Sequence, residues 1–257
     1  MKMINDDLSA SLGPGTIHIW LIEIDEQHPG VLTWEKFLSP EEIERSRQYR
    51  FELDRLRFVT RRGILRQLLR RYTGIAPEDI QYLTNPHGKL ALALHPLHFS
   101  VSHSQDRIAY AFSIRQDIGV DIEQVKPLPD LAQLAKTSFS LEECTGIISV
   151  NPSEQLESFY HIWTQKEAFI KANGEGLTYP LRDFSVSVDP HNPGRLLSTK
   201  NGDPSQWQMV SYVPEPGWRV ATCFRSKKSL EVKQYKTTMQ GLSLEKILED
   251  IPIISKT

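Results

Sequence analysis

Hydrophobic and polar positions alternate in two short stretches of the chain, and each stretch predicts a strand. The first stretch covers residues 17–22. The second covers residues 118–123 and places the carboxylates of Asp121 and Glu123 on one face. A hairpin is predicted later in each half. Residues 98–102 return as 107–113, and a second hairpin within 206–224 turns at 214–217.

Helical spacing of apolar residues predicts a long helix in each half, at residues 58–66 and 163–171. Each long helix is preceded by a capping box, in which a serine N-cap stands three residues before a glutamate. The two boxes are Ser39 with Glu42, and Ser140 with Glu143. A glycine and then a proline follow each long helix. The same signals therefore recur in the same order along the chain.

This recurrence predicts an α+β fold of two pseudo-symmetric halves, each a small antiparallel sheet packed against a long helix. Residues 1–116 form the predicted N-terminal half and residues 117–228 the C-terminal half. Residues 229–257 form a tail with a short amphipathic helix at 242–251. A shared site is expected in the cleft between the halves.

Composition adds little, but the distribution of charge adds more. The 257 residues are 39% hydrophobic and 24% charged, with a net charge of −2, as in an ordinary globular protein. Ten arginines lie between Arg45 and Arg71. They form either a solvated helix surface or a region that binds phosphate, nucleic acid or an acidic protein.

The expected cellular compartment follows from three features that the sequence does not show. Cys144 and Cys223 have neither zinc-type nor disulfide-framework spacing. The first fifteen residues are polar and do not resemble a signal peptide, and no apolar run reaches membrane-spanning length. We expect a cytoplasmic protein with no membrane partner.

The acidic strand and the second long helix carry the clearest chemistry. Asp121, Glu123 and Glu167 supply only oxygen ligands, and Lys171 lies one helical turn from Glu167, which suits Mg²⁺ holding a phosphate. Gly119 is expected to clear room for a large ligand. Arg62 takes the position of Glu167 when the halves are aligned, so this cation and this carboxylate are expected to face one cleft from the two halves. The alternative is a set of solvated acids with an ordinary i, i+4 ion pair.

The segment around Ser102 and His103 ends a predicted strand. Either Ser102 or Ser104 caps exposed backbone amides, or Ser102 and His103 donate hydrogen bonds to a phosphate. A serine hydrolase would also need a nucleophile turn and an acid–base partner, and neither is visible.

Residues 99–103, 118–123 and 163–171, in this order, resemble the Sfp-type phosphopantetheinyl transferase family (4'-phosphopantetheinyl transferase superfamily). The resemblance extends loosely from about Thr16 to Phe224. It implies a Mg²⁺-dependent enzyme that moves the phosphopantetheine arm of coenzyme A to a serine of an apo carrier protein of acyl, peptidyl or polyketide type. Adenosine 3',5'-bisphosphate is the implied second product.

The resemblance also implies roles for individual residues. The implied metal ligands are Asp121, Glu123 and Glu167, the catalytic residues Glu143 (as general base) and Lys171, and the coenzyme A-binding residues Arg57, Arg62, Lys89, Ser102, His103 and Lys171. A lysine common near the first capping box in the family is Glu42 here, with Arg45 as its substitute.

The remaining expectations concern partners. Residues 125–139 resemble the family's docking segment, with Leu128, Leu131 and Leu134 as contacts or as core residues. One chain holding both halves predicts a monomer, and nucleic acid is not an expected partner. The alternatives are an inactive module that binds coenzyme A or a nucleotide, and a Mg²⁺-dependent nuclease.

Overall fold

The protein is described here by a computed structural model that covers residues 12–24 and 34–238, and the amphipathic helix expected at 242–251 lies outside them. The first half contains β1 (Thr16–Glu23), α1 (Pro40–Arg47), α2 (Glu52–Thr73), β2 (Tyr82–Thr84), β3 (Leu90–Leu92), β4 (Leu97–Ser104) and β5 (Arg107–Ile114). The second half contains β6 (Ile118–Gln124), α3 (Leu131–Ser138), α4 (Leu141–Ser149), α5 (Gln155–Asn173), β7 (Phe184–Val186), β8 (Leu196–Thr199), β9 (Trp207–Tyr212) and β10 (Trp218–Arg225). Short 3-10 helices occupy η2 (Pro77–Asp79), η3 (Pro152–Glu154), η4 (Gly176–Thr178), η5 (Leu181–Asp183) and η6 (Pro204–Gln206).

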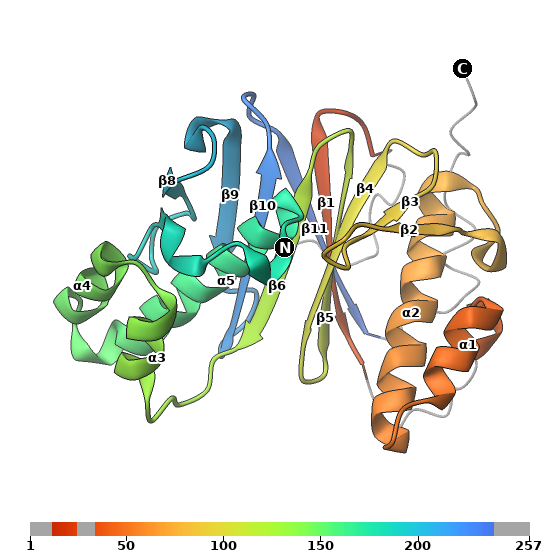
Figure 1. The fold of residues 1–257 in the computed structure, drawn as a ribbon, viewed down its shortest axis with the longest axis horizontal. Coiled ribbons are helices and arrows are strands. Elements are labelled where there is room, and N and C mark those ends of the chain that lie inside the picture. Colours follow the sequence, from red (N-terminus) through yellow and green to blue (C-terminus); the bar gives the residue numbers. More distant parts are fainter. Residues whose placement is uncertain (1–11, 25–33, 239–257) are drawn as a thin grey trace.

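The two halves repeat one topology, which confirms the predicted α+β class (Figure 1). Strands β1, β5 and β4 are neighbours in the first sheet, and β6, β10 and β9 are neighbours in the same order in the second. All of these pairs are antiparallel. Both predicted capping boxes form, and both long helices end at a left-handed glycine, Gly74 and Gly174.

The end of the described chain adds a strand to the first sheet, which the sequence pattern does not predict. Part of the segment assigned to the tail forms β11 (Glu231–Thr238), which pairs with β1 in parallel along its whole length. The first sheet therefore has the order β11-β1-β5-β4 and contains one parallel pair.

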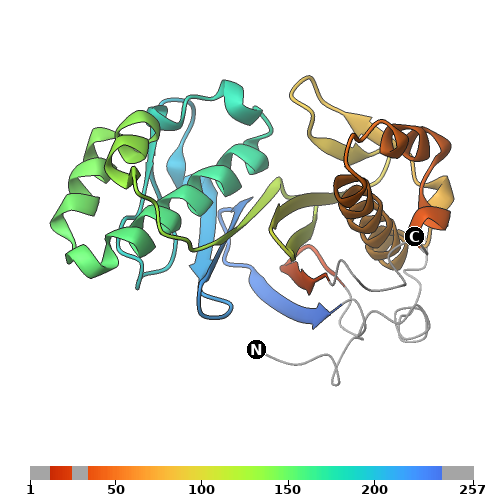
Figure 2. The same cartoon turned by 90° about the horizontal axis from the view of Figure 1, so that it is seen from below.

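Each sheet is covered by its long helix on one face and by the other sheet on the opposite face (Figures 1 and 2). On β1, Trp20 and Ile22 belong to the core with α2, whereas Ile17, Ile19 and Leu21 belong to a core shared with the second half. On β6, Ile118, Val120 and Ile122 join that shared core. The alternation of these strands thus reflects two buried faces, and in β6 the helix-facing residues are Gly119, Asp121 and Glu123.

Candidate active site

Strand β6 and helix α5 pack closely because Gly119 has no side chain. A Cβ at Gly119 would lie 2.0 Å from the carbonyl oxygen of Ala168 and 2.4 Å from the backbone nitrogen of Ala172. Gly119 therefore makes room for the helix backbone. This corrects the expectation that it makes room for a ligand. The close approach places Glu167 and Lys171 of α5 over the carboxylates of β6.

Asp121 and Lys171 form the centre of the candidate site. The Asp121 side chain is 4% exposed, and its Oδ1 accepts hydrogen bonds from Lys171 Nζ at 2.6 Å and from Ser102 Oγ at 2.7 Å. Lys171 Nζ also donates to Ser102 Oγ at 2.8 Å. Ser102 lies on β4, so this contact joins the first half to the second.

Glu123 and Glu167 lie in the electrostatic field of Asp121. Burial first, and then the charge of Asp121, raise the pKa of Glu123 to about 7 and raise the pKa of Glu167. Ser104 Oγ donates to Glu123 Oε2 at 2.8 Å and opposes this rise. Crowded carboxylates with raised pKa values are typical of a site that a cation stabilises.

The three carboxylates fit a magnesium ion better than a softer metal. As they stand in residues 12–24 and 34–238, no three or more acidic, histidine or cysteine side chains are grouped so that they could hold a metal ion. Oδ1 of Asp121 is directed at Lys171, whereas its buried Oδ2 has no hydrogen-bond partner. A free carboxylate oxygen beside two further carboxylates suits Mg²⁺, which takes one or two carboxylates and keeps several waters.

Cations gather around His103, at the end of β4. His103 is an exposed residue, but the partial burial of its imidazole, followed by the charges of Arg61, Lys171 and Arg57, lowers the pKa of His103 to about 4. Arg57 and Arg61 are one turn apart on α2, and Arg61 Nε donates to the Arg57 carbonyl at 3.0 Å. A neutral imidazole beside three cations is suited to hold an anion.

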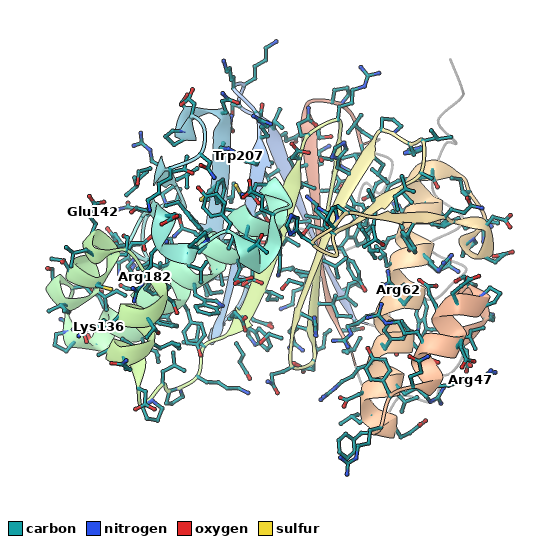
Figure 3. All side chains as sticks on the ribbon, viewed as in Figure 1. Arg47, Arg62, Lys136, Glu142, Arg182 and Trp207 are labelled. Atoms are coloured by element: carbon teal, nitrogen blue, oxygen red, sulfur yellow. The ribbon has the colours of Figure 1, made fainter. Side chains whose placement is uncertain are left out.

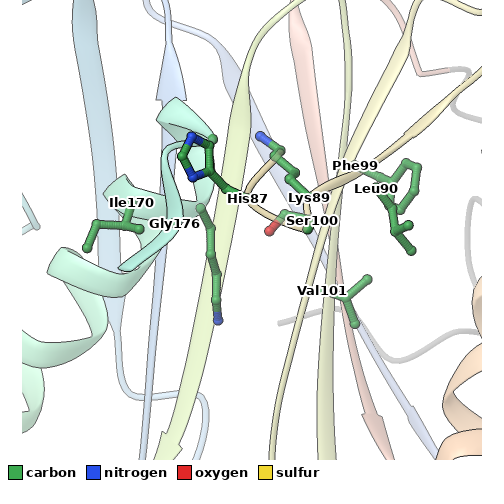
Figure 4. A pocket seen from close by; sticks show the side chains of 11 residues that line it. His87, Lys89, Leu90, Phe99, Ser100, Val101, Ile170 and Gly176 are labelled. Carbon is green, nitrogen blue, oxygen red and sulfur yellow. The ribbon is translucent and has the colours of Figure 1, made fainter. Parts of the chain in front are cut away.

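A pocket of about 310 Å³ lies between the halves next to Lys171 (Figure 4). The loop between β2 and β3 forms one wall through His87 and Lys89, while Phe99 and Ser100 of β4 and Ile170 of α5 also line the pocket. Lys89 Nζ donates to the carbonyls of Ile118 at 3.2 Å and Ala172 at 3.1 Å, and burial lowers the pKa of Lys89. Lys89 thus lines the pocket while tying its loop to the second half.

The structure does not bring Arg62 to the carboxylates, which corrects the expectation that it faces Glu167 across one cleft. Its Nε lies 3.0 Å from Oε1 of Glu42, and its guanidinium stacks on Tyr82. Glu42 also binds the buried Arg66 at 2.6 Å. Arg62 is therefore held beside α1 (Figure 3), where it lines another pocket together with Glu42, Arg66 and Tyr82.

Glu143 is also separate from the carboxylate group. It is fully buried, and its carboxylate accepts hydrogen bonds from Ser140 N, Val186 N and Lys166 Nζ, the last at 2.9 Å. Lys166 in turn donates to the carbonyls of Leu181 and Phe184. Because this buried carboxylate already accepts three hydrogen bonds, it holds α4 against α5. These contacts favour a structural role for Glu143 over the role of a general base.

Sequence reasoning missed three residues that the structure places in the network. Arg61 joins the cations at His103, Ser104 binds Glu123, and Lys166 neutralises Glu143. A signal existed for Arg61, which shares a helix face with Arg57, and for Ser104, which shares a strand face with Ser102. Nothing in the spacing of Lys166 signals its partner, because the two residues lie on different helices.

The expected docking segment is partly buried. Leu128 and Leu131 pack against the core of the second half, whereas Leu134 of α3 is 37% exposed. Leu141 and Ile148, one face of α4, are 83% and 76% exposed.

Comparison with known proteins gives consistent matches. Residues 117–223 match the 4'-phosphopantetheinyl transferase superfamily. The chain is 34% identical over 188 residues to the 4'-phosphopantetheinyl transferase Sfp of Bacillus subtilis, covering 73% of this chain and 82% of that protein. It is 30% identical over 203 residues to the 4'-phosphopantetheinyl transferase HetI of a Nostoc species, covering 77% of this chain and 83% of that protein. The solved holo-[acyl-carrier-protein] synthase of Thermotoga maritima aligns with 20% identity and a TM-score of 0.35, over 44% of this chain and 64% of that chain.

Proposed function

The chain belongs to the 4'-phosphopantetheinyl transferase superfamily and transfers phosphopantetheine to carrier proteins, and from this premise we propose that coenzyme A is the donor and Mg²⁺ the metal. The observation that carries the proposal is the contact of Lys171 and Ser102 with one oxygen of Asp121, which leaves the other buried oxygen without a partner. Asp121, Glu123 and Glu167 would hold the metal.

Coenzyme A would lie between the halves. The pocket beside Lys89 and Ser100 would receive part of the nucleotide, and the cations at His103, Arg57 and Arg61 would receive a phosphate. Lys171 and Ser102 would face the pyrophosphate. Since both halves of one chain supply these groups, we propose that a monomer is sufficient.

The reaction forms a bond between the oxygen of the carrier serine and a phosphorus of the pyrophosphate. The bond from that phosphorus to the leaving phosphate breaks, adenosine 3',5'-bisphosphate departs, and the serine proton goes to water. Mg²⁺, when bound, supplies positive charge that polarises the phosphate and stabilises the departing oxygen.

The residues of the chain contribute mainly position and charge, as in other phosphoryl transfers. Lys171 is held by Asp121 and Ser102, so its ammonium is oriented before the leaving group gains negative charge. Ser102 fixes this orientation from the first half, because its hydroxyl contacts both partners.

The carrier is the second substrate, and we propose that it docks beside α3. Leu134 is the most exposed of the three docking leucines, since Leu128 and Leu131 are partly buried against the core of the second half. In the part of the chain that the structure describes, no helix is both long and apolar enough to cross a bilayer.

The test is modification of an apo carrier protein by coenzyme A and Mg²⁺, followed by mass spectrometry. Glu167→Ala should lower the rate by about 100-fold or more, because it removes a metal ligand. Glu142→Ala, which removes an exposed carboxylate of α4, should have the wild-type rate. A normal rate for Glu167→Ala would reject the metal assignment.

The alternative function is a Mg²⁺-dependent nuclease, in which the carboxylates hold the metal and the arginines bind the nucleic acid backbone. It would appear as cleavage of nucleic acid that depends on Asp121, Glu123 and Glu167. Family membership favours the transferase, and the arginines divide between Glu42 and the His103 region rather than forming one continuous stripe.

A further inference from the structure

Three serines of β4 cross from the first sheet to the second. Ser100, Ser102 and Ser104 alternate along the strand and therefore share one side of it. Strands β4 and β6 belong to different sheets, so their backbones do not pair. Ser100 Oγ accepts a hydrogen bond from Val120 N at 3.1 Å, and Ser104 Oγ accepts one from Gln124 N at 3.2 Å. Serine hydroxyls thus take the place of a backbone ladder between the sheets.

The hydroxyls at the two ends of this row differ in what they donate. Ser104 Oγ donates to Glu123 Oε2 at 2.8 Å while accepting from the next residue of β6. The contact of Ser100 with β6 is to backbone. Removing the Ser100 hydroxyl therefore costs one hydrogen bond between the sheets, whereas removing the Ser104 hydroxyl costs two and releases a carboxylate.

We infer that Ser104 is a positioning residue that sets the affinity of the site for its divalent cation. The two hydrogen bonds of Ser104 fix its hydroxyl, so the hydroxyl holds one oxygen of Glu123 in place and leaves the other oxygen of the carboxylate for the metal. A held carboxylate loses less side-chain freedom when a cation binds. This inference rests on the proposed function, since it concerns the same metal site.

The site lies at the junction of the halves, where a residue of the first half can hold a carboxylate of the second. The hydrogen bond from Ser104 reaches Glu123 only while β4 stays packed against β6, so the packing of the two sheets is coupled to the geometry of a proposed metal ligand. Ser102 does the same for Asp121.

The experiment measures Mn²⁺ binding to the full chain by electron paramagnetic resonance, with coenzyme A present and no carrier protein. Ser104→Ala should weaken Mn²⁺ binding by about 10-fold or more. Ser113→Ala is the matched control, because it also removes a buried serine hydroxyl of the first half but lies outside the proposed site, and it should keep the wild-type affinity. Ser104→Ala loses two hydrogen bonds to β6 and should lower the melting temperature at least as much as Ser113→Ala, which loses one hydrogen bond. Ser104→Thr and Ser104→Val form a second pair of similar shape that differs in the hydroxyl, and only Ser104→Val should bind Mn²⁺ weakly.

Equal Mn²⁺ affinities for Ser104→Ala and Ser113→Ala would overturn the positioning role and leave the metal site standing. Equal affinities for Ser104→Thr and Ser104→Val would do the same, even if Ser104→Ala did not fold. Absence of Mn²⁺ binding by the wild type would overturn the metal site of the proposed function as well.

Discussion

The first half and the second half share a topology but differ on the face that each sheet turns to its long helix. Strand β1 presents Trp20 and Ile22 to α2, and Trp20 Nε1 donates to the hydroxyl of Tyr72 on that helix at 2.8 Å. Strand β6 presents Asp121 and Glu123 to α5, where Asp121 meets Lys171. Equivalent layers thus carry an aromatic core in one half and a charged site in the other.

The capping boxes show the same division. Glu42 is 11% exposed and binds two arginines, whereas Glu143 is 1% exposed and binds one buried lysine. The two halves therefore share the order of their strands and helices and differ in the side chains at a few equivalent positions. The following variants test how far that division goes.

The largest effect is expected where the helix-facing contact is catalytic. Lys171→Ala should lower kcat by about 100-fold or more with little change in KM for coenzyme A, because the ammonium stabilises charge that appears only in the transition state. Steady-state kinetics with an apo carrier measures both constants. Tyr72→Phe, which removes the hydroxyl from the corresponding contact in the first half, should keep kcat. An unchanged kcat for Lys171→Ala would remove the contrast between the halves.

The second effect concerns stability at the two capping boxes. Glu143→Ala should lower the free energy of unfolding by about 3–5 kcal/mol, because it leaves Lys166 charged and buried without its partner. Urea unfolding followed by circular dichroism gives this quantity. Glu42→Ala should cost less, since its arginines are closer to solvent or have other acceptors. A Glu143→Ala protein of wild-type stability but without activity would restore the general-base role.

The third effect tests the close approach of strand and helix in the second half. Gly119→Ala should lower stability by about 3 kcal/mol or more, because the new methyl group meets the backbone of α5. Gly15→Ala provides the control, since a Cβ there has no atom within 4 Å. Thermal unfolding compares them. If Gly119→Ala kept both stability and activity, Gly119 would not be what sets the distance between α5 and the carboxylates.

The smallest effect concerns pH, and here the halves should agree. Burial lowers the pKa of His18 in the first half to about 4 and that of His161 in the second half to about 3. A histidine held neutral stabilises the fold above its unfolded pKa of about 6.5, and this contribution is lost as pH falls toward the lowered value. Stability should therefore decline from pH 6.5 downwards, and His161→Gln should flatten that decline in urea titrations. An identical slope in the variant would contradict the assignment.

The repeat and the site followed from sequence where the signal was local. Alternation along β1 and β6, both capping boxes and the long helices depend on neighbours in the chain, so the two-half α+β fold was predictable. The approach of Asp121 to Lys171 was also implied, because strand and helix face each other in such a layer.

Contacts set by tertiary packing were not predictable. Arg61 rather than Arg62 lies near His103, because Glu42 of α1 holds Arg62 and Arg66. The partner of Glu143 and the role of Gly119 likewise depend on how α5 sits against its neighbours. The parallel pairing of β11 with β1 joins residues near the two ends of the described chain, and no local pattern encodes such a pairing.

That last pairing has a consequence for biosynthesis. Strand β1 leaves the ribosome early, but its outer edge stays open until β11 has been made. An unpaired strand edge is a template for association with other chains, and contacts of such long sequence separation form slowly. A nascent chain stopped at residue 228 would contain all the proposed metal ligands and still carry an incomplete first sheet. The first sheet is therefore completed only when β11 has been synthesised, which is later than the synthesis of the last proposed metal ligand.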